Sequence, residues 1–121
     1  MNLVLFGVVV GVAAGLLGSL LGVGGGILLV PAFVYILGLE MKVAVSTSMA
    51  VIVVTSLSAT LNNATDKLSL IDWRVAAATG IAAAVAAWFG ADLMKTLSSQ
   101  FLTRLFGVVL ILVGLRALFA K

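Results

Sequence analysis

The chain has 121 residues, of which 64% are hydrophobic and 9% are charged, and it contains neither cysteine nor histidine. A soluble domain carries roughly 25% charged residues, so this composition predicts an integral membrane protein. It excludes disulfides and thiol chemistry, and it removes the commonest metal ligand and the commonest general base at neutral pH. The formal net charge of +3 forms no basic cluster of the kind that binds nucleic acid.

A chain of this length is expected to form one domain, here a single transmembrane unit over residues 1–121. Four apolar regions approach or exceed the roughly 20 residues that a helix needs to cross the hydrocarbon core. They are Leu3–Leu39, Val43–Leu61, Val75–Leu93 and Leu105–Phe119. We therefore expect an all-α polytopic bundle of four to five transmembrane segments in contact with lipid. All long apolar stretches serve as spans, so we expect no enzyme activity, no cofactor and no metal.

The first region, Leu3–Leu39, has no charged residue and is far longer than one crossing requires. Its stretch SLLGVGGGILLVPAF, from Ser19, places four glycines and a proline within ten positions. Glycine and proline cost about 1 and about 3 kcal/mol inside a helix. They predict a broken first helix, with a spanning piece Leu3–Leu21 and a piece Ile27–Leu39 that is too short for an ordinary crossing. A re-entrant half-helix and a short tilted span both fit the second piece.

The broken segment indicates a pocket, because unwound backbone at membrane depth survives only where protein buries it or where it lines a polar cavity. Absent side chains permit unusual φ/ψ angles and close approach of a ligand at Gly22, Gly24, Gly25 and Gly26. The helix that starts near Ile27 has free N–H groups and a positive dipole end, which favour an anion. Pro31 lies in about the first turn of this helix. A packing hinge without a ligand is the alternative.

Small residues recur every fourth position before the break, at Gly7, Gly11, Gly15 and Ser19, and predict close packing against another helix.

The second region is rich in hydroxyl groups, and from Ser46 it reads STSMAVIVVTSLSATLNN. At 100° per residue, one face within about 80° holds Ser48, Thr55, Ser58 and Asn62. Hydroxyls can also bond to carbonyls of their own helix. Beside a glycine break, we interpret this face as the polar wall of a shared pocket.

Charged residues lie near the ends of the expected spans. If each region crosses once, one side of the membrane receives Lys42, Lys95 and Arg104, and the other receives Lys67, Arg74, Arg116 and Lys121. This near balance permits insertion in both directions, and hence an antiparallel homodimer equivalent to an inverted-repeat transporter. A dimer of parallel copies is the alternative.

The pattern GLLGSLLGVGGGILLVPAF from Gly15, with AVSTS from Ala44 and TSLSATLNN from Thr55, resembles the sulfite exporter TauE/SafE family of membrane permeases. The resemblance continues through DWRVAAATGIAAAVAAWFGADL and FLTRLFGVVLILVGL, over nearly the whole chain. It implies transport of sulfite, thiosulfate or organic sulfonates. It places the glycine motif of the family on Gly22, Gly24, Gly25, Gly26 and Pro31, and its hydroxyl segment on Ser46, Thr47 and Ser48. Typical members contain two such units, whereas this chain has one.

We therefore expect a permease for small sulfur-containing anions that acts as a homodimer with alternating access, in the cell membrane and, in a prokaryote, the inner membrane. The expected substrate-binding residues are Gly22, Gly24, Gly25, Gly26, Ile27, Pro31, Ser46, Thr47, Ser48, Thr55 and Asn62. An anion channel and a non-transporting scaffold subunit are the alternatives. The sequence leaves open the particular anion, the direction of transport and the coupling ion.

Overall fold

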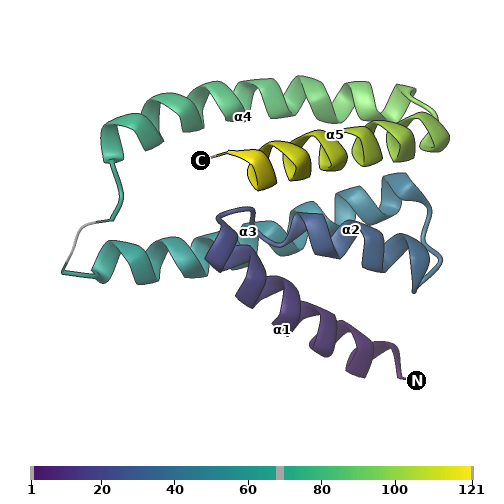
Figure 1. The fold of residues 1–121 in the computed structure, drawn as a ribbon, viewed down its shortest axis with the longest axis horizontal. Coiled ribbons are helices and arrows are strands. Elements are labelled where there is room, and N and C mark those ends of the chain that lie inside the picture. The colour runs from purple at the N-terminus through teal and green to yellow at the C-terminus, as the bar shows by residue number, and fades with distance from the viewer. Residues whose placement is uncertain (1, 68–69, 121) are drawn as a thin grey trace.

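The computed structural model describes residues 2–67 and 70–120. Its described part folds into α1 (Leu3–Leu21), α2 (Gly26–Tyr35), α3 (Met41–Thr65), α4 (Trp73–Thr96) and α5 (Ser99–Phe119), without a strand (Figure 1). All of these except the 10-residue α2 are long and apolar enough to cross a membrane. The expected all-α polytopic class is thereby confirmed.

The expected break in the first apolar region is present between α1 and α2. Backbone φ is +69° at Gly22, +63° at Gly24 and +84° at Gly25. These values lie in the left-handed region, which residues with a Cβ adopt only at a cost of roughly 1–2 kcal/mol, so the glycines permit the turn. Pro31 lies inside α2, where its ring removes the N–H that would pair with the carbonyl of Ile27.

The hairpin of α1 and α2 packs against α3. The N-terminus and the connector from α2 to α3 lie at the same end of the molecule, at the right in Figure 1. α2 therefore runs back toward the end of the molecule at which α1 begins. The buried core lies where the three helices meet and consists of Ala14, Leu29, Phe33 and Ala44.

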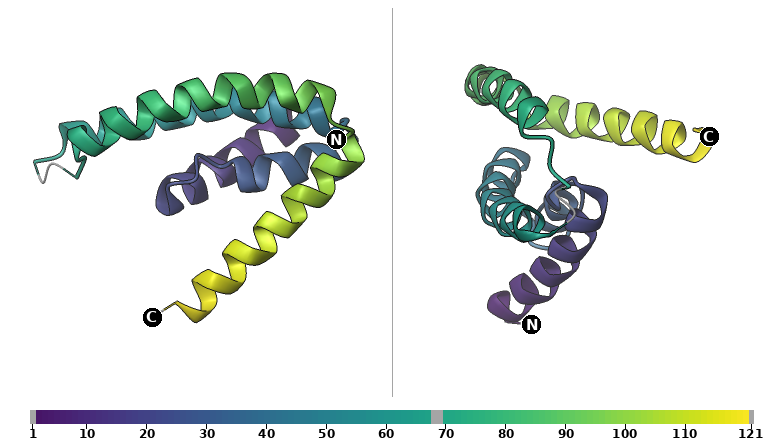
Figure 2. Two further views of the ribbon diagram at one scale, coloured as in Figure 1. Left: turned by 90° about the horizontal axis from the view of Figure 1, so that it is seen from above. Right: turned by 90° about the vertical axis from the view of Figure 1, so that its left-hand side faces the viewer.

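The α4–α5 hairpin is attached mainly at one end. Ser99 Oγ donates to Glu40 Oε1 at 2.7 Å, and Lys42 Nζ donates to the carbonyl of Lys95 at 3.0 Å. Beyond this end α5 diverges from α4 (Figure 2), and neither helix has a buried residue among those described. Their large apolar surface is therefore available to lipid or to another polypeptide.

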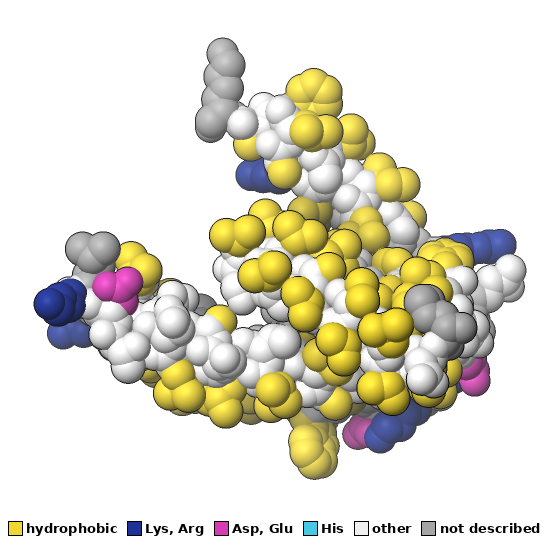
Figure 3. Space-filling model, turned by 90° about the horizontal axis from the view of Figure 1, so that it is seen from below, with side chains coloured by type: hydrophobic (Ala, Val, Ile, Leu, Met, Phe, Trp, Pro, Cys, Tyr) yellow, Lys and Arg dark blue, Asp and Glu magenta, His cyan; other side chains and the backbone are white. Residues whose placement is uncertain are grey.

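Surface chemistry also fits a bilayer. In Figure 3, apolar side chains are spread over the visible face, and charged side chains gather toward its extremities. Side chains such as Leu20, Trp88 and Leu118 are more than three-quarters exposed, an arrangement that is unfavourable in water but favourable against hydrocarbon. The chain is a multi-pass membrane protein.

Candidate functional site

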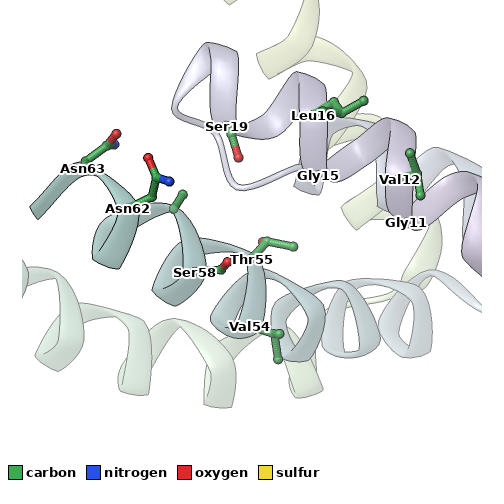
Figure 4. A pocket seen from close by; sticks show the side chains of 11 residues that line it. Gly11, Val12, Gly15, Leu16, Ser19, Val54, Thr55, Ser58, Asn62 and Asn63 are labelled. Carbon is green, nitrogen blue, oxygen red and sulfur yellow. The ribbon is translucent and has the colours of Figure 1, made fainter. Parts of the chain in front are cut away.

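A cleft of about 590 Å³ separates α1 from α3 beside the break (Figure 4). This volume lies within the range of roughly 300–1,000 Å³ that is usual for small-molecule sites. We call it the α1–α3 cleft, and its lining consists of Gly11, Val12, Gly15, Leu16, Ser19, Val54, Thr55, Ser58, Ala59, Asn62 and Asn63. A neighbouring hollow of about 180 Å³ adds Gly18, Gly22, Gly24, Ser56 and Thr60, and we call it the side branch because the two share Ser19, Thr55, Ala59 and Asn63.

The wall from α1 is formed by residues four positions apart, Gly11, Gly15 and Ser19. A Cβ atom built on Gly11 or Gly15 would meet nothing within 4 Å. Among the residues that the structure describes, the close helix packing expected on this stripe is thus not seen, and the missing side chains instead leave room in the cleft. α1 makes its close contact with the break at Gly18, on a different face of the helix, where a Cβ would collide with the backbone of Gly25.

The wall from α3 supplies hydroxyl and amide groups. Thr55 Oγ1 lies 3.1 Å from the carbonyl oxygens of both Gly24 and Ile52, so one hydroxyl hydrogen is shared between the break and its own helix. In Figure 4 the side chains of Ser58 and Asn62 point into the space that Ser19 enters from α1. Hydroxyls and carboxamides both donate and accept hydrogen bonds, so this wall can hold a polar solute.

The cleft runs from the middle of the protein toward one end. Thr55 lies near the middle of the 25-residue α3, whereas Asn62 and Asn63 lie in its last turn. Asp66 and Lys67 follow directly after the helix. In a bilayer, the cleft therefore reaches from near the midplane to the surface on the side of the α3–α4 connector.

Four of the expected binding positions line the cleft or its side branch, namely Gly22, Gly24, Thr55 and Asn62. The next two glycines pack against other elements. A Cβ on Gly25 would lie 2.8 Å from the carbonyl oxygen of Ala14, and a Cβ on Gly26 would lie 2.9 Å from Cδ1 of Ile52. Of the amides from Gly24 to Ile27 that were expected to bind an anion, the lining within the described residues includes Gly24 alone.

The remaining expected positions lie elsewhere. Pro31 lines a separate, mainly apolar hollow of about 130 Å³ between α2, the start of α3, and α5. Ser48 is buried, and its Oγ donates to the carbonyl of Val45 at 2.8 Å. Ser46 and Thr47 are exposed near the start of α3, in the half of this helix that lies away from the cleft.

Several residues of the cleft were missing from the expected set, namely Gly11, Gly15, Ser19, Ser56, Ser58, Thr60 and Asn63. A signal for part of this set is present in the sequence. Ser19 continues the series of Gly7, Gly11 and Gly15, and a polar residue at the end of a small-residue stripe can pair with a polar face on another helix. Ser58 belongs to the polar face that was recognised.

The fold and the cleft define a multi-pass α-helical membrane protein with a polar site beside a helix break. Residues 2–119 match the family model described as Sulfite exporter TauE/SafE. The chain belongs to the sulfite exporter TauE/SafE family.

Two curated relatives are similar along most of this chain. "Probable membrane transporter protein YunE" of Bacillus subtilis (strain 168) is 34% identical over 115 residues, which cover 89% of this chain and 41% of the relative. "Probable membrane transporter protein MJ0441" of Methanocaldococcus jannaschii is 34% identical over 110 residues, which cover 86% of this chain and 40% of the relative. This chain thus matches less than half the length of either relative. No solved structure matches it.

Proposed function

We propose that the protein is a carrier for a small sulfur oxyanion or sulfonate and that the α1–α3 cleft is its binding site. The observation that carries this proposal is a polar cleft that reaches the helix break near the middle of α3. Lipid offers no hydrogen bonds to such groups, so they need a solute, water or a second polypeptide. Membership of the sulfite exporter TauE/SafE family supports a sulfur-containing anion as the solute.

The anion lies between the two walls of the cleft. Hydroxyl groups of Ser19 and Ser58 and the carboxamide of Asn62 donate to its oxygen atoms. Thr55, whose hydroxyl hydrogen is shared between the carbonyls of Gly24 and Ile52, holds the Gly24 backbone that closes the inner end. Bonds of this kind to a charged acceptor are stronger than bonds between neutral groups. Gly25 and Gly26 shape the break through their contacts with Ala14 and Ile52.

A homodimer is part of the proposal. A single copy leaves the described residues of α4 and α5 without burial and leaves the cleft open. The matched relatives are more than twice as long as the region that they share with this chain. A second copy would cover the cleft, and rocking of one copy against the other would expose the site to each side in turn. An antiparallel pair agrees with the nearly equal numbers of basic residues at the two ends.

Flux in proteoliposomes tests the function. Purified protein should take up radiolabelled methanesulfonate faster than protein-free vesicles do, the uptake should saturate, and methanesulfonate on the opposite side should accelerate it. Flux that stays linear with concentration and shows no such acceleration would support a channel instead. Uptake equal to that of protein-free vesicles, for methanesulfonate and sulfite alike, would contradict transport and favour a scaffold subunit.

A further inference from the structure

The α1–α3 cleft is lined by uncharged side chains along its whole length, and so is its side branch. The charges nearest to it along α3, Asp66 and Lys67, follow the end of the helix. We infer that the cleft selects singly charged anions over doubly charged ones. This inference rests on the proposed function and narrows its substrates to sulfonates and hydrogensulfite, at the expense of sulfate, thiosulfate and the sulfite dianion.

A second copy of the chain would bring uncharged segments to the part of the cleft near the middle of the membrane. The sequence has seven basic and four acidic residues, and they lie in connectors or toward helix ends. α1 and α2 have none, and the stretch of α3 from Val43 to Thr65 has none either. A homodimer in either orientation therefore brings neutral segments of α1, α2 and α3 to the middle of the membrane.

The preference follows from how two energies depend on charge. The cost of moving an ion out of water grows with the square of its charge, so a dianion costs roughly four times as much as a monoanion of the same size. Attraction to fixed neutral dipoles, such as the hydroxyls of Ser19 and Ser58, grows only in proportion to the charge. The described lining of the cleft has no positive side chain that could offset the larger desolvation cost of the dianion, so the monoanion binds better.

The hydrogen-bonding groups of the cleft also suit a protonated oxyanion. Hydrogensulfite has one hydroxyl donor besides its acceptor oxygens. Asn62 offers a carbonyl oxygen as well as an NH₂ group, and each serine hydroxyl can accept as well as donate. A site built from Lys or Arg would offer donors alone.

Methanesulfonate and sulfate provide a matched pair of substrates, because both are tetrahedral and similar in size but differ by one charge. In wild-type proteoliposomes, methanesulfonate flux should exceed sulfate flux at least about tenfold, which corresponds to ~1.4 kcal/mol. Sulfite flux above that of protein-free vesicles should fall relative to methanesulfonate flux as the pH rises through neutrality, because hydrogensulfite then loses its proton. Sulfate flux equal to or faster than methanesulfonate flux would overturn the inference while leaving transport intact. Absence of flux for every anion would overturn both.

A charge placed in the cleft gives a second test. Asn62→Lys should raise the ratio of sulfate to methanesulfonate flux by about tenfold or more, which corresponds to ~1.4 kcal/mol. The control is Gln100→Lys, which adds the same charge in the first turn of α5, away from the cleft. The flux ratio is independent of the amount of protein that folds and inserts. An unchanged ratio in Asn62→Lys, with measurable methanesulfonate flux, would contradict the inference.

Discussion

Thr55 Oγ1 donates a hydrogen bond to the carbonyl oxygen of Gly24 at 3.1 Å and so joins the helix break to the middle of α3. Gly24 has a left-handed backbone, and its carbonyl lies outside both helices that flank it. A backbone carbonyl without a partner at membrane depth costs several kcal/mol. The hydroxyl of Thr55 is therefore both a wall of the cleft and a support of the break that forms its inner end.

Thr55→Val removes this donor and preserves the shape of the side chain. We expect the variant to lose roughly 1–3 kcal/mol of stability, because the Gly24 carbonyl loses its partner, and to lose most of its flux. Thermal unfolding in detergent and methanesulfonate uptake measure the two effects. Thr55→Ser retains the hydroxyl and should retain most of both properties.

Thr79→Val is the matched control for the loss of a hydroxyl. Thr79 Oγ1 donates only to the carbonyl of Val75 within α4, at 2.6 Å, and lies outside the cleft. Equal behaviour of the Thr55→Val and Thr79→Val variants would show that the bond to Gly24 has no special role.

Gly15→Leu tests whether the space along α1 is used for transport. Both Gly15 and Gly7 have open space at the position of a Cβ, but only Gly15 lines the cleft. Leucine is a better helix former than glycine by roughly 0.8 kcal/mol, so neither Gly15→Leu nor Gly7→Leu should destabilise α1. We expect flux to drop severalfold or more in Gly15→Leu and to stay near the wild-type value in Gly7→Leu. The reverse order would place the pathway elsewhere.

The stability lost on substituting a glycine of the break should depend on the atoms around it as well as on its φ angle. Gly22→Ala places a Cβ in open space, so its cost is the roughly 1–2 kcal/mol of a left-handed conformation. Gly25→Ala adds a contact of 2.8 Å with the carbonyl oxygen of Ala14, which is backbone and cannot move aside cheaply.

We therefore expect Gly25→Ala to unfold at a clearly lower temperature than Gly22→Ala, as measured in detergent micelles. Equal unfolding temperatures would mean that α1 and α2 do not pack as closely as the contact between Ala14 and Gly25 requires.

The sequence was sufficient to predict the fold class, the spans and the break. Glycines and a proline inside an uncharged apolar run are costly in a continuous helix, and charged connectors mark where helices end. The position of Thr55 in the pocket was also predictable, because helical periodicity alone places it on the same face as Asn62.

The sequence could not show which amides face the cleft. That depends on how α2 is rotated and on contacts between distant residues, such as Gly25 with Ala14 and Gly26 with Ile52. Likewise, Ser48 shares the polar face of α3 with Thr55, but its position along the helix places it in the core beside α2, where it bonds to Val45. The sequence predicts which residues share a polar face of α3, whereas tertiary packing decides which part of that face lines the cleft.

The α1–α3 cleft is proposed to be a water-filled anion site, and cysteine labelling tests this directly because the sequence contains no cysteine. Ser58→Cys places a thiol in the cleft, and Leu57→Cys places one at the same depth on α3 but outside the lining. A thiol reacts as the thiolate, which needs an aqueous environment. An impermeant, sulfonate-bearing methanethiosulfonate reagent should label Ser58→Cys, and methanesulfonate should slow the labelling, whereas Leu57→Cys should stay unlabelled. Equal inertness of both cysteines, or labelling of Ser58→Cys at a rate that methanesulfonate does not change, would contradict the account.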